Sequence, residues 1–412
     1  MDRSAAASTL SQPKTGVRAP EIGRIPGASW GRTELRIVSV SAFTPAGLSG
    51  YGSRAWDCQL LPRQRRLILK EPAERPAATQ SFASEKINDN VRRKPVTEIK
   101  GHINPMRRPG ELGIHSVDHF HFVVPDLKAA QHFYSEFGLD VAENGNRLTL
   151  RTGGGPHVWG MLGEGARKKH QYVSFGAFED DLDRFSKRLQ EMAVPRVDPP
   201  TGVDSNGLWF HDHDGNLVEI AVKPKTSPSE KSKFTAISAG PGERGAPFRS
   251  TMKRTYPRRL AHILMFTTDV AKAIQFYTRV LGLRLSDHSG DNIAFLHGIH
   301  GSDHHMIAFA RSNAPGTHHF SWDVGSVDEI GAGAMHMLGK GYDRGWGLGR
   351  HVLGSNLFHY VRDPWGSYSE YSADIDFVPV DCDWKAQDNP PEDSFYAWGP
   401  NVPDDFVHNY EA

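Results

Sequence analysis

Hydrophobic and polar positions follow the same order twice along the chain, starting near Leu112. In the first copy, a strand-like alternation begins at Val117 and a helical spacing of apolar residues begins near Asp126. In the second copy, the same succession begins at Leu260 and near Asp269. Matched positions keep one constant offset, which indicates two copies of one supersecondary unit.

Each copy ends with a turn followed by one more strand pattern. The closing segments run from Asp212 to Glu219 in the first copy and from Asp363 to Glu370 in the second. Further strands and a second helix are predicted between the opening and closing segments. In the second copy this helix starts at Ser326 with a glutamate three residues later, as in a capping box. Strands and helices mixed in this way predict an α+β fold.

The segments outside the two copies show no sustained period. The first is rich in Pro, Ser, Ala and Arg, and its basic residues outnumber its acidic ones about two to one, a composition typical of a poorly ordered extension. Its acidic residues and the lack of an amphipathic helix argue against a transit peptide. We expect it to be a disordered or non-native extension, which includes the case of a mis-assigned start with the real one near Met106, and a functional tail is the alternative. The predicted division is an extension (1–111), an N-terminal domain (112–222), a linker (223–256), a C-terminal domain (257–376) and a tail packed on that domain (377–412).

Composition narrows the class of protein. The 48 basic and 48 acidic residues balance, so no global charge attracts nucleic acid. No segment approaches the ~20 apolar residues that a membrane span needs. Two cysteines cannot build a disulfide framework, so a reducing, cytoplasmic location is expected. The unusual feature is the count of 21 histidines, many of them in the last third of the chain.

Histidine and glutamate occur at strand positions where a metal site would need them. In the second copy, His262 lies on the first predicted strand and Glu370 on the last. A further strand carries His318 and His319. Because side chains alternate along a strand, only one of the two is expected on the concave face of the sheet. Alignment of the copies places His319 at the position that Tyr172 has in the first copy.

Two imidazoles and one carboxylate on neighbouring strands form a facial triad. Such a triad leaves three positions of a six-coordinate metal open, which suits non-heme Fe(II) and O2, whereas zinc more often has four ligands, or three and a water. The first copy keeps His119 and Glu219 but lacks the middle ligand. We therefore predict that the first copy is a scaffold without a metal.

Two stretches of the second copy are similar to motifs of the type I extradiol dioxygenases, which are members of the vicinal oxygen chelate superfamily. The residues that carry the resemblance are Phe295, His305, Ala308 and Phe309 in one stretch, and Gly349, His351, Tyr360, Asp363, Pro364, Gly366 and Glu370 in the other. His359 departs from the motif, which has an aliphatic residue or Phe there. The resemblance extends from 112 to 375 and is most specific in the second half.

The resemblance implies tandem paired βαβββ modules in two barrel-like domains. It also implies residue roles: His262, His319 and Glu370 as metal ligands, His305 as the acid/base residue, His351 and Tyr360 as substrate contacts, and Asn356 and Trp346 as further groups at the substrate or a lid. His304 is the alternative to His305, since adjacent strand residues point opposite ways. The register of the family favours His305.

The expected function is that of an extradiol dioxygenase, which inserts both atoms of O2 into a catechol-type ring at an Fe(II) site. Mn(II) uses the same ligands, and the fold commonly assembles, so a homo-oligomer is expected. Two alternatives stay open. One is another metalloenzyme of the superfamily, such as a glyoxalase or an epimerase, which needs no O2. The other is a non-catalytic small-molecule-binding protein of the same fold.

Overall fold

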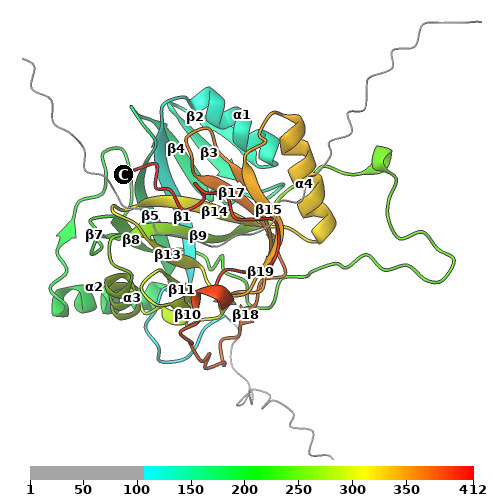
Figure 1. Cartoon of the computed structure of the whole chain (residues 1–412). Helices are drawn as coiled ribbons and strands as arrows, with labels where there is room; N and C mark the ends of the chain where they lie inside the picture. The colour runs from blue at the N-terminus through cyan, green and yellow to red at the C-terminus, as the bar shows by residue number, and fades with distance from the viewer. Residues whose placement is uncertain (1–105) are drawn as a thin grey trace, which may run out of the picture. The chain divides into compact units, whose positions relative to one another are not determined.

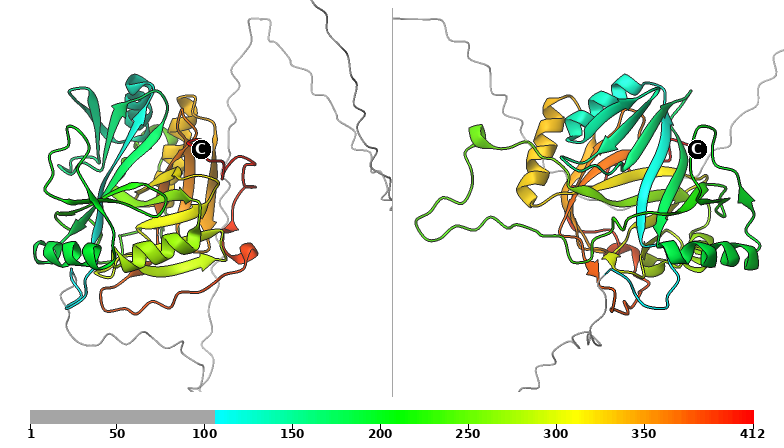
Figure 2. Two further views of the ribbon diagram at one scale, coloured as in Figure 1. Left: turned by 90° about the vertical axis from the view of Figure 1, so that its left-hand side faces the viewer. Right: turned by 180° about the vertical axis from the view of Figure 1, so that it is seen from behind.

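The computed structural model describes residues 106–412, and the predicted extension 1–111 lies almost entirely outside the described residues. The described part contains two large β-sheets, one from each copy of the repeat (Figure 1). Both sheets are curled and lie beside each other (Figure 2). This arrangement confirms the predicted α+β fold of two domains.

The first sheet has eight strands in the order β2-β3-β4-β1-β5-β8-β7-β6. Its elements are β1 (Ser116–Val124), α1 (Leu127–Phe137), β2 (Asp140–Asn144), β3 (Arg147–Arg151), β4 (Gly160–Glu164), β5 (Lys169–Ala177), η1 (Glu179–Asp181), α2 (Leu182–Glu191), β6 (Arg196–Val197), β7 (Leu208–His211) and β8 (Leu217–Val222). The antiparallel pair β1–β5 joins two βαβββ modules, one on each side.

The second sheet repeats this order with one added strand, as β10-β11-β13-β9-β14-β17-β16-β15-β19. Its elements are β9 (Arg259–Thr267), α3 (Val270–Arg279), β10 (Arg284–Ser289), β11 (Ile293–His297), β13 (Ile307–Arg311), β14 (Gly316–Asp323), α4 (Val327–Gly339), β15 (Gly345–His351), β16 (Leu357–Arg362), β17 (Tyr368–Ala373) and β19 (Tyr396–Trp398). The pair β9–β14 joins the two modules, and β12 (Ser302–Asp303) pairs separately with β18 (Phe377–Val378).

Capping residues set where the helices begin and end. The Asp126 carboxylate accepts hydrogen bonds from two N–H groups in the first turn of α1, and Gly138 ends that helix at a φ of 103°, which favours glycine. At α4, the Ser326 hydroxyl accepts from the Glu329 N–H at 3.1 Å, which confirms the predicted start. The Glu329 carboxylate accepts from the N–H of Gly325, one residue earlier than in a standard capping box.

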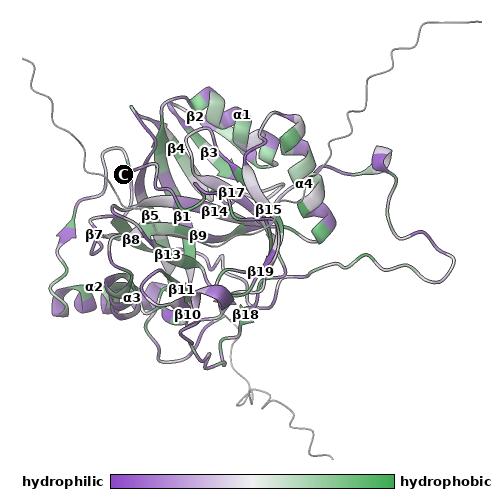
Figure 3. Ribbon diagram, in the orientation of Figure 1, coloured by the Kyte–Doolittle hydropathy of each residue, from purple (hydrophilic) through white to green (hydrophobic). Residues whose placement is uncertain are grey.

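The two sheets share one hydrophobic core. Phe120 of β1 stacks on Phe320 of β14 with ring centroids 3.7 Å apart, and Phe137 of α1 stacks on Tyr371 of β17 at 3.9 Å. Helices α1 and α4 each carry apolar and polar stripes (Figure 3), as expected for helices with one packed face. Because side chains alternate along a strand, packing Phe320 into this core turns His319 to the opposite, concave face.

The segments outside the sheets differ from one another. Residues 223–256 contain no strand and only the short helix η2 (Arg249–Thr251), and part of this segment projects from the sheets as a long loop (Figure 1). The tail instead adds β19 at the edge of the second sheet, next to β15, and it also contains β18, which pairs with β12, and η3 (Pro391–Asp393). None of the helices described combines the length and hydropathy required to cross a bilayer.

Candidate active site

Three neighbouring strands of the second sheet bring two histidines and a glutamate together. His262 lies on β9, His319 on β14 and Glu370 on β17, and β14 pairs with both other strands. Ser321 of β14 stands opposite His262 in one register and opposite Glu370 in the other, so these side chains leave the sheet on one face. The two histidines and the glutamate, called the triad below, are at most 3% exposed.

The separations within the triad fit three cis ligands of one metal ion. His262 Nε2 lies 3.2 Å from His319 Nε2 and 3.2 Å from Glu370 Oε2, and His319 Nε2 lies 3.5 Å from Glu370 Oε2. In an octahedron with metal–ligand distances of ~2.1 Å, cis ligand atoms are about 3.0 Å apart and trans ones about 4.2 Å. All three pairs are closer to the cis than to the trans separation, so the triad could hold a metal ion on one face.

Two polar atoms of the triad lack the hydrogen bonds that burial normally requires. Glu370 Oε2 and His262 Nδ1 have no hydrogen-bond partner among the described residues, whereas Glu370 Oε1 accepts from Asn356 Nδ2 at 3.1 Å. A buried carboxylate oxygen without a partner is costly unless a cation satisfies it. Burial by itself raises the pKa of Glu370, but the neighbouring His262 and His351 outweigh burial and keep that pKa below its ordinary value. The metal-binding carboxylate form is therefore favoured.

A β-bulge brings both histidines of β14 to the concave side. The pairing of β14 with β9 skips from Thr317 to His319, so His318 leaves the strand alternation. His318 Nε2 donates to the Phe406 carbonyl at 2.8 Å, and His318 Nδ1 lies 2.7 Å from His319 Nδ1. A neutral His318 then accepts the Nδ1 proton of His319, which leaves His319 Nε2 free for a metal. The prediction that only one of the two would face the concave side was wrong, because it assumed an unbroken strand.

His351 at the end of β15 and Tyr360 on β16 form a hydrogen-bonded pair beside the triad. His351 Nδ1 donates to the Phe395 carbonyl at 2.8 Å, so its Nε2 accepts from the Tyr360 hydroxyl at 2.9 Å. Burial, followed by the charge of Glu370, raises the pKa of Tyr360 well above its ordinary value. The Tyr360 hydroxyl therefore keeps its proton and remains a hydrogen-bond donor.

His305 faces the triad from the segment between β12 and β13. Its ring centroid lies 4.1 Å from that of His262. The His304 ring points elsewhere and places its Nε2 2.9 Å from Asp287 Oδ2. The two histidines lie in a loop, so the expectation that they occupy a strand was wrong. Their rings nevertheless diverge, and of the two only His305 lines the cavity described next.

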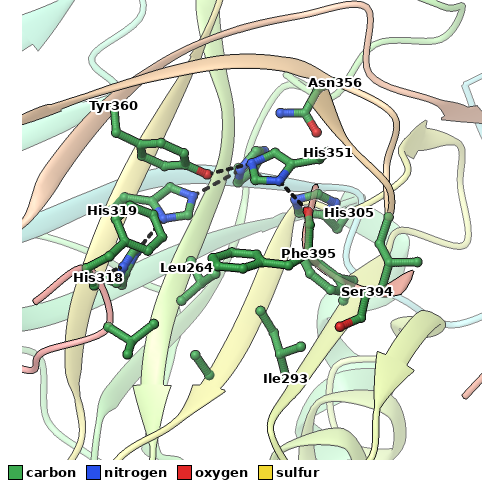
Figure 4. Close-up of a pocket in the computed structure, with 16 residues that line it drawn as sticks. Leu264, Ile293, His305, His318, His319, His351, Asn356, Tyr360, Ser394 and Phe395 are labelled. Carbon is green, nitrogen blue, oxygen red and sulfur yellow. Dashed lines mark hydrogen bonds between the residues drawn. The ribbon is translucent and has the colours of Figure 1, made fainter. Parts of the chain in front are cut away.

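The triad histidines line a largely apolar cavity with about 540 Å³ of empty space, called the triad cavity (Figure 4). Its apolar walls are Leu264, Ile293, Phe295, Ala310, Leu353, Phe395, Phe406 and Val407, and its polar lining includes His305, His318, His351, Asn356 and Tyr360. Trp346 does not line it. The indole of Trp346 stacks on Tyr360 with centroids 5.7 Å apart and donates to the Pro400 carbonyl at 2.9 Å, so it supports the phenol from behind.

Sequence reasoning missed what the tail contributes to this cavity. The tail was expected only to pack on the C-terminal domain, and its residue Phe395 does pack against Trp346. Phe395 and Phe406 also close the cavity, and their backbone carbonyls orient His351 and His318. The motif positions of the sequence carried no signal for these contacts.

The corresponding positions of the first sheet hold different chemistry. The Tyr172 hydroxyl, at the place of His319, lies 3.3 Å from His119 Nε2, and His119 Nδ1 lies 2.7 Å from Asp118 Oδ2. Glu219, which matches Glu370, accepts a hydrogen bond from the Ser205 hydroxyl. Protein groups thus satisfy the atoms that would otherwise face a metal, although the absence of a metal there stays a prediction.

The profile of the Glyoxalase/Bleomycin resistance protein/Dioxygenase superfamily matches residues 116–220 and 259–371, which together exceed half of the chain. This chain belongs to that superfamily. The two matched ranges coincide with the two sheets, so each sheet is one superfamily domain, and the triad lies in the second domain.

Individual relatives within the superfamily span both domains. Metapyrocatechase 2 of Cupriavidus necator is 49% identical over 308 residues, which cover 75% of this chain and 96% of that protein. Manganese-dependent 2,3-dihydroxybiphenyl 1,2-dioxygenase of Geobacillus genomosp. 3 is 25% identical over 307 residues, 69% of this chain and 93% of that one. The solved complex of homoprotocatechuate 2,3-dioxygenase from Brevibacterium fuscum with 3,4-dihydroxyphenylacetate matches with a TM-score of 0.57 at 20% identity, over 73% of this chain and 94% of that one. The predicted vicinal oxygen chelate fold is thereby confirmed.

Proposed function

We propose that this chain is an extradiol dioxygenase, which opens a catechol-type ring with both atoms of O2 at an Fe(II) centre held by His262, His319 and Glu370. The observation that carries the proposal is the set of three short separations, 3.2 to 3.5 Å, between the ligand atoms of the triad, at the wall of an apolar cavity. The 49% identity to a protein named metapyrocatechase supports the same reaction class.

The triad suits a metal that must accept a chelating substrate as well as O2. A bound ferrous ion supplies Lewis acidity and one-electron chemistry to the substrate and to O2. Mn(II) can use the same donors, and one relative is named for manganese. We favour Fe(II) because two imidazoles and one carboxylate with open positions are typical of non-heme Fe(II) oxygenases.

The residues around the triad bind and orient the ring. The Tyr360 hydroxyl has one proton, which it donates to His351 Nε2 in this structure, and when the diol binds this proton can turn to one oxygen of the diol instead. Asn356 acts one step away, because its amide fixes the Glu370 carboxylate at 3.1 Å. Trp346 likewise acts through the phenol on which it stacks. The apolar walls accommodate the ring and exclude water, which strengthens each of these polar contacts.

His305 takes the proton of the diol in this proposal, and its neighbours prepare it to do so. The Asp287 carboxylate can only accept, so His304 Nε2 donates to it at 2.9 Å. His304 Nδ1 then accepts from His305 Nδ1 at 3.1 Å. This chain of hydrogen bonds leaves His305 Nε2 without a proton, so the resting His305 is a base.

We expect Asp287→Asn to lower kcat about tenfold or more, with the KM for catechol and the metal content changed by less than about twofold. The Gln387 N–H donates to Asp287 Oδ1 at 2.9 Å, so an asparagine would place its oxygen there and turn its amide N–H toward His304. That donor would favour the wrong tautomer of both histidines. Steady-state kinetics with metal analysis measure the effect. Asp388→Asn is the control, because Asp388 is an exposed neighbouring carboxylate that takes no part in the hydrogen bonds from Asp287 to His305. Equal kcat values for both variants would contradict the proposed relay.

We also propose that the enzyme is a cytoplasmic homo-oligomer whose partners are a catechol-type substrate and O2, with no nucleic-acid or membrane partner. The balance of 48 basic against 48 acidic residues supports the absence of nucleic acid, and the two cysteines fit a reducing compartment.

The test of the function is to load the purified chain with Fe(II) without oxygen and then to add O2 and a panel of catechols. We expect a yellow ring-opened product and the uptake of one O2 per ring. A parallel sample loaded with Mn(II) compares the two metals. Turnover that needs no O2 would contradict the proposal and favour glyoxalase or epimerase chemistry. Tight binding of catechols without turnover would favour a binding protein.

A further inference from the structure

The first sheet contains a second cavity, distinct from the triad cavity. It has about 810 Å³ of empty space and is lined by residues of β1, β3, β5, β6, β7 and β8 and of the loop that follows β6. His121, Arg147 and Gln171 provide much of its polar lining, and Asp198 also reaches it. No residue proposed for the dioxygenase reaction lies in this cavity.

The residues that line the two cavities occupy equivalent strand positions in the two sheets. Arg147 is the first residue of β3, and Ile293 is the first residue of β11. Arg147 pairs with the fourth residue of β4, and Ile293 pairs with the fourth residue of β13. His121 lies two residues after His119, as Leu264 lies two residues after the matching His262. Ile293 and Leu264 are apolar walls of the triad cavity. In the first sheet a guanidinium and an imidazole therefore replace two aliphatic side chains.

These two groups lack protein partners. The half-buried guanidinium of Arg147 makes no hydrogen bond or ion pair, not even with Asp198, within the part of the chain that the structure describes. His121 is 8% exposed, and its Nε2 has no hydrogen-bond partner there either. Buried polar atoms are rarely left unsatisfied, as His121 Nε2 is, and the solvent-accessible guanidinium of Arg147 beside it is free to bind an anion, so the two together point to a ligand.

We propose that this cavity binds a small organic carboxylate, with Arg147 as the anchor and His121 as a second polar contact. The planar guanidinium matches both oxygens of a carboxylate, and such charge-assisted bonds are among the stronger ones in proteins. Val197, Val203 and Leu217 add apolar wall, which favours an organic acid over inorganic phosphate. The site needs no metal, so this proposal can be tested independently of the proposed reaction.

The charge that attracts the ligand comes from Arg147. Burial, followed by the charge of Arg147, lowers the pKa of His121 to about 4, so His121 is neutral at pH 7. A neutral imidazole can still donate one N–H to a carboxylate oxygen.

The test is calorimetric titration of the full chain with sodium benzoate at constant ionic strength, in a buffer free of carboxylate and phosphate. We expect saturable binding that Arg147→Gln weakens at least about tenfold. His121→Leu, which recreates the lining of the triad cavity, should weaken it by a smaller factor. Arg196→Gln, at an exposed arginine of β6, is the matched control and should bind like the parent chain.

Melting curves establish that each variant is folded, and His121→Leu provides the comparison if Arg147→Gln does not fold. No saturable binding by the parent chain would overturn the proposal. Equal binding by the parent and Arg147→Gln would also overturn it, because benzoate would then occupy another place, such as the triad cavity. A parallel titration with inorganic phosphate separates the ligand classes, and phosphate that binds as tightly as benzoate would contradict an organic acid.

Discussion

Replacement of Glu370 by glutamine is expected to lower the affinity for Fe(II) by more than about a hundredfold and to abolish ring opening. Asn356 donates to Glu370 Oε1, so the oxygen of the new amide would turn toward Asn356. The NH2 group would then take the place of Oε2, 3.2 Å from His262 Nε2, where a lone pair is needed. Iron per chain after gel filtration and O2 uptake with catechol measure the two losses, and a melting curve checks the fold.

Glu219→Gln is the matched control, because it makes the same change at the corresponding position of the first sheet. Glu219 is as deeply buried, at 1% exposed against 0% for Glu370, and bonds to the Ser205 hydroxyl. We expect this variant to keep its iron and its activity. If Glu370→Gln retained iron, or if Glu219→Gln lost it, the metal would bind at a place other than the triad.

The repeat is what made the fold and the triad predictable from the sequence. Two copies of one pattern must fold alike, so a residue in one copy identifies its counterpart in the other. The comparison of Tyr172 with His319 was enough to distinguish the second sheet, which has the middle ligand, from the first sheet, which lacks it. The strand period then placed His262 and Glu370 on the same face, as the structure has them.

The remaining parts of the site follow from features without a local pattern. A bulge at His318 interrupts the alternation of side chains along the strand, and the pattern of hydrophobic and polar residues does not predict this bulge. Phe395 and Phe406 orient histidines through backbone carbonyls, which every residue type possesses. These contacts come from a tail far along the chain, so only the three-dimensional packing reveals them.

Substitution of His305 by phenylalanine is expected to leave iron bound and to lower kcat by about 10²–10⁴-fold. Phenylalanine keeps a ring against Phe295, where the present centroids are 4.9 Å apart, so the cavity retains its shape. It has no atom that can take a proton from the diol. Steady-state kinetics and metal analysis measure both outcomes. His359→Phe makes the same exchange on β16 outside the triad cavity and should keep the parental kcat. A parental kcat in His305→Phe would mean that another group takes the proton.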